Sequence, residues 1–159
     1  MDADRHRRDD LLLGAWGPDA DHAWLTGAAG TLLMWNRTDP GVAVPDPALP
    51  ALSPAAADLG AIQGAGGVVW IAAGQSQVLR GTADGWTLVD AGVHVAGMAA
   101  VAADDVVASS DGQSLMARWN GTAFVPEDSG SGTATPSLFQ VPGGPVLAAG
   151  IIGGILQHR

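Results

Sequence analysis

Lysine, cysteine and tyrosine are all absent from this 159-residue chain, and the first two absences exclude whole classes of function. Without lysine there is no P-loop lysine and no Schiff-base nucleophile. Without cysteine there is no thiol nucleophile, no thiolate metal site and no disulfide. The seven basic residues are all arginine, against sixteen acidic ones, and the formal net charge is −9. Because duplex binding needs clustered basic residues, and these cluster only within residues 1–8, we expect no nucleic-acid partner.

Long apolar runs are missing as well. Residues 59–79 and 129–157 contain no charged side chain, but glutamines interrupt the first and prolines and glycines the second. A membrane helix needs about 20 consecutive, mostly apolar residues, so we expect no membrane span. The first ten residues carry charges of both signs, and Leu11–Leu13 is too short for the apolar part of a secretion signal. No signal peptide is visible, and composition alone leaves the compartment open.

Glycine, proline and short apolar segments are what the chain has in abundance. It is 47% hydrophobic, enough to bury a core, and its 23 glycines and 10 prolines interrupt the sequence every few residues. No window suits a long helix. Short apolar segments bounded by Gly, Pro, Asp or Asn are typical of β-strands. The sequence therefore predicts an all-β protein.

The strand pattern occurs four times. Equivalent positions in the second strand of each unit are 46, 37 and 40 residues apart: Trp24, Trp70, Val107 and Leu147. A period near 40 matches the four-stranded blade of a β-propeller. After a charged tail at 1–10, we predict β-propeller-like repeats over 11–159, about four blades of antiparallel strands with the last blade incomplete. The expected units are 11–46, 58–90, 94–126 and 137–159, with a proline-rich insert at 37–54 that lengthens the first interval.

Within each unit the first two strands carry small apolar side chains, as expected of strands buried on both faces at the centre of a propeller. The outer strands carry the arginines and much of the aromatic content. Tryptophans buried between blades stabilise a propeller through their large apolar area, and this interpretation is preferred to a ligand platform for five of them: Trp24, Trp35, Trp70, Trp86 and Trp119.

Three segments resemble a known propeller repeat: Ala23–Gly27, Asp84–Trp86 and Arg118–Gly121. They are similar to repeats of photosystem II assembly-factor-like and sialidase-type (BNR, Asp-box) propellers of bacteria. The resemblance covers all but the first ten residues and the insert. It implies a propeller and leans toward an extracytoplasmic bacterial location, but it names no activity, because such repeats serve assembly factors, adhesins, sensors and enzymes. Residues 109–114 are similar to an Asp-box turn without its closing aromatic residue.

The fourth unit lacks the outer strand that the other three have. Four blades close into a ring only rarely, and an open array exposes sheet faces and an edge. Three interpretations follow: a fragment of a longer protein, a half-propeller completed by a second copy as a homodimer, or a small four-bladed ring.

No set of side chains typical of catalysis is present. The histidines lack ligand spacing, there is no nucleophile elbow, and no carboxylate pair lies in an apolar setting. Asp19, Asp21 and His22 are the best metal candidates, but Gly17, Pro18 and Asp19 have the composition of an ordinary turn, and we interpret them as solvated. We expect no catalytic residue, no metal and no cofactor.

The predicted function is a non-catalytic binding or interaction module with a protein or a carbohydrate partner. Its ligand would meet backbone groups of the small, glycine-rich loops between the second and third strands. The loop candidates are Thr26, Gly27, Gly30, Gly74, Ser76, Ser110, Asp111, Gly112, Gly150 and Gly153. The insert at 37–54 is a further binding candidate, because it is expected on a rim where propellers bind partners. The alternative is a polyproline-like spacer without a partner. The alternatives are a glycoside-hydrolase or sialidase-like enzyme, which needs converging arginines or paired carboxylates, and a structural segment of a bacterial surface repeat protein.

Overall fold

The computed structural model describes residues 11–45, 58–112, 115–129, 132, 134, 136–141, 144–150 and 155–158. Apart from one 3-10 turn at Ala28–Gly30, its regular structure is entirely β. The strands form four separate antiparallel sheets, each a meander in which neighbours in sequence pair. The all-β, propeller-type prediction is confirmed. Within this described part, no helix is long and apolar enough to cross a membrane.

Each sheet is one blade. Blade 1 contains β1 (Leu12–Trp16), β2 (His22–Gly27), β3 (Leu32–Asn36) and β4 (Asp39–Pro45). Blade 2 contains β5 (Leu59–Ala65), β6 (Val68–Ala73), β7 (Gln77–Thr82) and β8 (Gly85–Asp90). Blade 3 contains β9 (Gly97–Ala102), β10 (Asp105–Ser109), β11 (Leu115–Trp119) and β12 (Phe124–Asp128). Blade 4 contains β13 (Ser137–Gln140), β14 (Val146–Ala149) and β15 (Ile155–His158).

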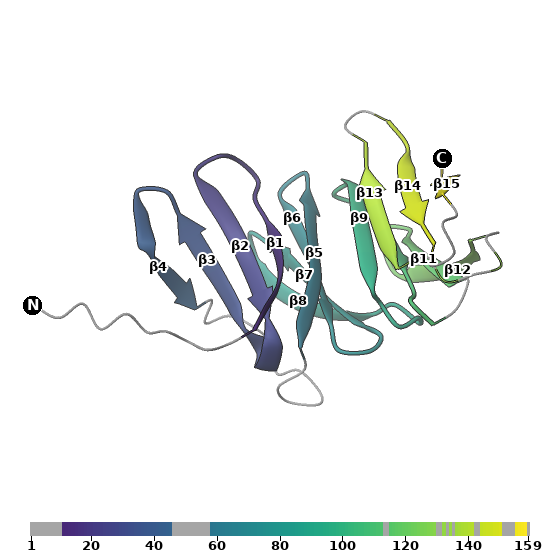
Figure 1. The fold of residues 1–159 in the computed structure, drawn as a ribbon, viewed down its shortest axis with the longest axis horizontal. Coiled ribbons are helices and arrows are strands. Elements are labelled where there is room, and N and C mark those ends of the chain that lie inside the picture. Colours follow the sequence, from purple (N-terminus) through teal and green to yellow (C-terminus); the bar gives the residue numbers. More distant parts are fainter. Residues whose placement is uncertain are drawn as a thin grey trace, which may run out of the picture.

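The blades stand side by side in an open arc, with blade 1 at one end and blade 4 at the other (Figure 1). The first strand of each blade is innermost: β1 packs on β5, β5 on β9 and β9 on β13. Among the described residues, no packing of this extent joins β13 back to β1. The molecule is therefore a partial propeller, and the chain does not close on itself as a four-bladed ring.

Alternation along the strands gives each blade two apolar faces. We call the face toward the preceding blade the front face and the face toward the following blade the back face. Trp70 lies on the back face of blade 2 and packs against Trp119 of blade 3, whereas its neighbour Ile71 lies on the front face in a cluster with Leu32 of blade 1. Val107 occupies the back face of blade 3, against Ala148 of blade 4. The blades are held together by these three apolar junctions.

The proline-rich insert differs from its predicted extent. Residues 39–45 form β4, which pairs with β3 as the outer strand of blade 1. This strand lies within the predicted first unit, 11–46, although the prediction also placed these residues in the insert. Pro40 and Pro45 are compatible with it, because proline is tolerated on an edge strand, where one side of the backbone needs no partner. The rest of the predicted insert, 46–54, lies outside the described residues.

Candidate functional site

The three junctions between blades differ at one end of the strands. This is the end that carries the turn between the first and second strands and the turn between the third and fourth strands of each blade. Between blades 2 and 3 this place is filled with aromatic rings. Trp70 contacts Trp119 and Phe124 edge-on, at centroid distances of 5.0 and 5.8 Å, and Arg80 stacks over the Trp70 ring at 5.5 Å. At the two flanking junctions the same place is hollow, and these hollows are the candidate binding sites.

The larger hollow lies between blades 1 and 2 and has a volume of about 590 Å³. We call it the tryptophan groove, because three half-buried indoles line it: Trp16, Trp24 and Trp86. Trp24 and Trp86 meet edge to face across the junction, with centroids 5.8 Å apart and planes at 83°. Apolar concave sites of this volume are typical of ligand pockets.

Glycines shape the floor of the tryptophan groove. A Cβ atom on Gly64 would lie 2.4 Å from the Trp16 ring, and one on Gly81 would lie 2.6 Å from the Trp86 ring. Each indole therefore packs directly against the backbone of a glycine, where a larger residue would clash with the ring. Gly66 and Gly67, both with positive φ, form the turn beside them and also line the groove. The groove thus presents aromatic surfaces next to accessible peptide groups.

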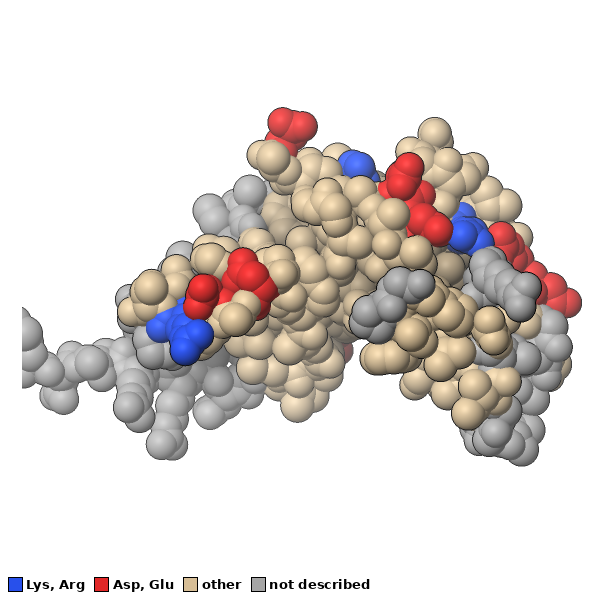
Figure 2. Space-filling model, turned by 90° about the horizontal axis from the view of Figure 1, so that it is seen from above, with Lys and Arg blue, Asp and Glu red and all other residues tan. Residues whose placement is uncertain are grey.

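Two exposed aspartates are next in sequence to residues that line this groove. Asp19 follows the lining residue Pro18, and Asp84 follows the lining residue Ala83. Figure 2 looks onto this turn-bearing side of the arc and shows the charged side chains in small groups of both signs. One such group is the Arg37–Asp21 pair, at 3.5 Å. The surroundings of the groove suit a ligand that is apolar or positively charged.

Hydrogen bonds within one turn stabilise the charged form of the Asp19 carboxylate. The Asp19 carboxylate accepts the backbone N–H groups of Asp21 at 2.8 Å and His22 at 2.9 Å, and it contacts Nδ1 of His22 at 2.9 Å. These hydrogen bonds, with the Asp21 N–H the largest cause, hold the pKa of Asp19 below its ordinary value of 3.8. The hydrogen bonds of the Asp19 carboxylate therefore stabilise the folded chain at pH values above the pKa of this carboxyl in the unfolded chain. This contribution is lost as the pH falls through its lower pKa in the folded chain.

An NMR titration of the side-chain carboxyl is expected to show Asp19 ionising below 3.8, because hydrogen bonds favour the charged form. In the variant His22→Ala the midpoint should rise toward the ordinary value but not reach it, since the backbone bonds remain. The native chain, titrated in the same buffer, is the control. Equal midpoints for Asp19 in the two proteins would contradict the role given to the imidazole.

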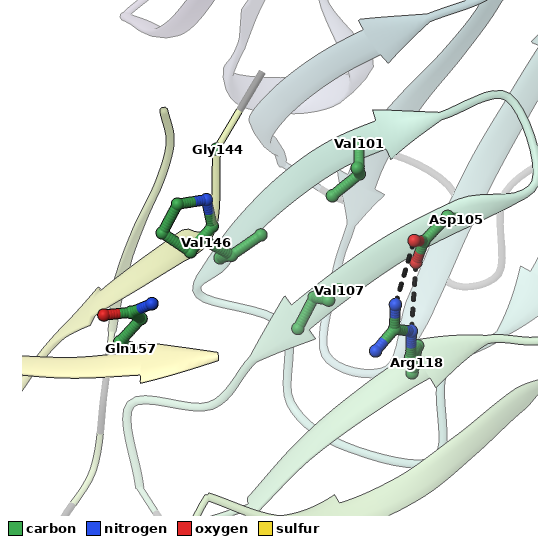
Figure 3. A pocket seen from close by; sticks show the side chains of 8 residues that line it. Val101, Asp105, Val107, Arg118, Gly144, Val146 and Gln157 are labelled. Carbon is green, nitrogen blue, oxygen red and sulfur yellow. Dashed lines mark hydrogen bonds and ion pairs between the residues drawn. The ribbon is translucent and has the colours of Figure 1, made fainter. Parts of the chain in front are cut away.

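The smaller hollow, of about 340 Å³, lies between blades 3 and 4. Figure 3 shows Asp105 and Arg118 on the blade 3 side, with Gln157 of β15 on the other. Arg118 donates from Nε and Nη2 to the two carboxylate oxygens of Asp105 at 3.0 and 2.9 Å. The bonds to Asp105 raise the pKa of the Arg118 guanidinium. Because the Arg118 guanidinium is already in a bidentate ion pair with Asp105, the smaller hollow has less capacity than the tryptophan groove to bind a charged ligand.

The loops predicted to grip a ligand lie at the opposite ends of the strands from both hollows. Their backbone groups are hydrogen-bonded to the segments that connect neighbouring blades. Gly74 N–H donates to the Asp58 carbonyl at 3.1 Å, and Ala91 N–H donates to the Ser76 carbonyl at 2.7 Å. The backbone groups expected to hold a ligand at these positions therefore stabilise the blade connections.

The other loop candidates have similar surroundings. Thr26 is fully buried and donates from Oγ1 to the Gly60 carbonyl at 2.7 Å, which ties blade 1 to blade 2. Ser110 is buried and accepts the Gly112 N–H, and Asp111 contacts His94 Nδ1 at 2.7 Å. Gly27 is buried, Gly30 and Gly150 are half-buried, and Gly153 lies outside the described residues. The structure does not bring these residues together into one cavity, and their role in binding remains a prediction.

Metal ligation has no geometric support in the described ranges, where no group of three or more metal-ligating side chains gathers. Asp19 and His22 bind each other, and Asp21 faces Arg37.

The tryptophan groove was not predicted from the sequence. The sequence pattern predicts Trp24 and Trp86 in the packing between blades and indicates no role for Trp16. The sequence feature that indicates the groove is the glycine-rich segment Gly64–Gly67, where the backbone carries no side chain and an aromatic ring can pack against it. Pairing this segment with Trp16 required knowledge of which blades are neighbours.

The comparisons with known proteins agree with this architecture. No protein-family model and no curated protein sequence matches the chain. The computationally designed Ika4 protein has a similar structure, with a TM-score of 0.70 at 14% identity over 99% of this chain and 98% of that one. The Swd1 β-propeller domain of Myceliophteria thermophila gives 0.69 at 12% identity, over 93% of this chain and 50% of that one.

A third similar structure is YCF48 bound to D1 peptide, with a TM-score of 0.52 at 14% identity over 94% of this chain and 63% of that one. The chain thus spans about half of the Swd1 domain and less than two thirds of the YCF48 chain. These likenesses define the class of protein, a partial β-propeller, and agree with the predicted similarity to assembly-factor propellers at the level of the fold. The Asp-box relationship and the bacterial origin remain predictions.

Proposed function

We propose that this chain is a non-catalytic binding module and that the tryptophan groove is its ligand site. The observation that carries the proposal is the gathering of three half-buried indoles around one cavity with a glycine floor. The fold supports a binding or scaffold role.

The ligand class we propose is an extended peptide with a positively charged side chain. A guanidinium or ammonium group over an indole face gains about 0.5–2 kcal/mol. Asp19 and Asp84 beside the groove add favourable charge, and the net charge of −9 attracts cations at long range. The open peptide groups of Gly66 and Gly67 offer hydrogen bonds to a peptide backbone.

Calorimetric titration with two capped five-residue peptides tests this proposal. One peptide has arginine at its centre, and the matched peptide has glutamine there. The arginine peptide is expected to bind more tightly, and the variant Trp86→Leu should weaken its binding about tenfold, the loss of about 1.4 kcal/mol of cation–π attraction. Val125→Ala, a change at an exposed strand position away from the groove, should leave binding unchanged.

Three results would overturn the proposal. They are equal affinities for the two peptides, no binding of either peptide at millimolar concentration, and binding of a neutral sugar chain such as cellotetraose in preference to both. The last result would assign the indoles to stacking on sugar rings, in line with the carbohydrate partner considered from the sequence.

A further inference from the structure

The two ends of the arc expose apolar faces of the kind that are buried at every internal junction. In the described part of the chain, no blade precedes the front face of blade 1 and no blade follows the back face of blade 4 (Figure 1). This feature is independent of the tryptophan groove, and an inference drawn from it goes beyond the proposed function.

The front face of blade 1 repeats the front face of blade 2. On blade 2, fully buried Leu59, Ile71 and Leu79 pack in one cluster with Leu32 of blade 1. Strand pairing identifies the equivalent residues of blade 1. Leu12 pairs with Gly27 as Leu59 does with Ala73, and Leu25 pairs with Leu33 as Ile71 does with Leu79. Leu12, Leu25 and Leu33 thus form the same kind of surface, on which no other described blade packs. Leu12 is 48% exposed, and Leu25 and Leu33 are half-buried.

The back face of blade 4 repeats the other half of the junction. One back-face position of the third strand is occupied by Leu32, Val78 and Met116 in blades 1, 2 and 3, and all three are at most 3% exposed. Its equivalent in blade 4 is Ile155, which is 75% exposed. Phe139, paired with Leu147 on the same face, is 63% exposed.

One residue on the front face of blade 1 and one on the back face of blade 4 have the positions of two residues that contact each other at an internal junction. Trp119 on the front face of blade 3 packs on Trp70 of the preceding blade. Trp35 occupies the position of Trp119 in blade 1, two residues after Leu33 as Trp119 follows Ala117. Leu147 occupies the position of Trp70 in blade 4. A blade 4 placed before blade 1 would therefore seat Leu147 beneath Trp35, a large ring over a smaller aliphatic side chain.

We propose that the occupant of both end faces is a second copy of this chain, so that two arcs close into one eight-bladed ring. Blade 4 of each copy packs on blade 1 of the other. The two junctions are related by a two-fold axis, the symmetry that most soluble dimers adopt. In agreement with this, 93% of this chain aligns with 50% of the Swd1 propeller domain, so an arc of this length makes up about half of that domain.

The expected area suffices for a stable dimer. A face of three or four strands spaced about 4.8 Å apart and about 17 Å long covers roughly 250–300 Å² in projection. Two junctions bury four such faces, roughly 1,100 Å², and side-chain relief brings this into the range of about 1,200–2,000 Å² found in specific interfaces. The described side chains of the two faces named above are uncharged, so their burial leaves no unpaired charge.

Light scattering coupled to gel filtration, over a hundredfold dilution series, tests the stoichiometry. The native chain is expected at twice its mass of 15.9 kDa. Ile155→Asp should raise the dimer dissociation constant about a hundredfold or more, because closure would bury an uncompensated carboxylate. Val125→Asp changes an exposed position of blade 3 away from both end faces and should leave the dimer intact. A native chain that runs as one copy, or as more than two, overturns the proposal, as does equal dissociation of the two variants.

Cross-linking tests the orientation without relying on a destabilised variant. Because the chain has no cysteine, Leu12→Cys and Phe139→Cys each introduce a single thiol. A short bis-maleimide should join the two variants when they are mixed and neither variant to itself. Cross-linking of Phe139→Cys to itself would show blade 4 against blade 4 and overturn the ring, as would the absence of any cross-link. A single-copy protein that still binds the arginine peptide refutes the ring alone, and a dimer that binds no peptide refutes the proposed function alone.

Discussion

Trp70→Ala is expected to lower the free energy of unfolding by about 3–5 kcal/mol, the range for removing a buried aromatic side chain. Trp70 has no exposed surface and lies at the centre of the best-packed junction, in contact with Trp119 and Phe124. Its removal leaves a cavity between blades 2 and 3 and withdraws the ring on which Arg80 lies. A loss of this size is a large share of the roughly 5–15 kcal/mol that stabilises a typical domain.

Denaturant unfolding followed by far-ultraviolet circular dichroism measures this loss, at one fixed protein concentration because association adds to apparent stability. Trp24→Ala is the matched control, since Trp24 occupies the equivalent position of blade 1 but is only half-buried. It should cost clearly less. Trp70→Phe should also cost less than Trp70→Ala, because it keeps a ring and removes an indole N–H for which the described residues offer no acceptor. Equal losses for Trp70→Ala and Trp24→Ala would show that the central junction is not the stronger one.

Gly97→Ala is expected to lower the free energy of unfolding by about 1–3 kcal/mol. Gly97 lies at the start of β9, and a Cβ atom there would stand 2.4 Å from the Pro136 carbonyl oxygen and 3.0 Å from Oγ of Ser109. The nearest atom belongs to the backbone that leads into blade 4, so relief requires moving that blade rather than rotating a side chain. The variant should loosen the junction between blades 3 and 4.

Gly112→Ala provides the control for this experiment, because a Cβ atom at Gly112 would have no atom within 4 Å and the residue has no positive φ. It is expected to unfold within about 0.5 kcal/mol of the native chain. Hydrogen exchange locates the effect: amides of β13 and β14 should lose protection in Gly97→Ala and keep it in Gly112→Ala. Unchanged stability of Gly97→Ala would mean that the linker before β13 adjusts freely.

The local sequence determined the strands of this protein and their grouping into four repeated sheets. Short apolar segments between glycines and prolines predicted strands, and the spacing of Trp24, Trp70, Val107 and Leu147 predicted four units of one sheet each. Both signals are local, because strand alternation and turn residues depend on neighbours in the chain. The exception was β4, where prolines typical of a linker occupy an edge strand.

Only the tertiary structure decided which surfaces are available to a ligand. Trp24 and Trp70 occupy equivalent positions in the repeat, yet one lines a groove and the other is buried, because the residues opposite them come from different blades: Trp86 beside Trp24, but Trp119 and Phe124 beside Trp70. In the same way, the glycine-rich loops between the second and third strands were predicted to bind a ligand. In the structure their backbone groups form hydrogen bonds to the segments that connect the blades. A repeat specifies the blade, whereas the contents of each junction depend on pairs of side chains far apart in sequence, and only the packed arc brings those pairs together.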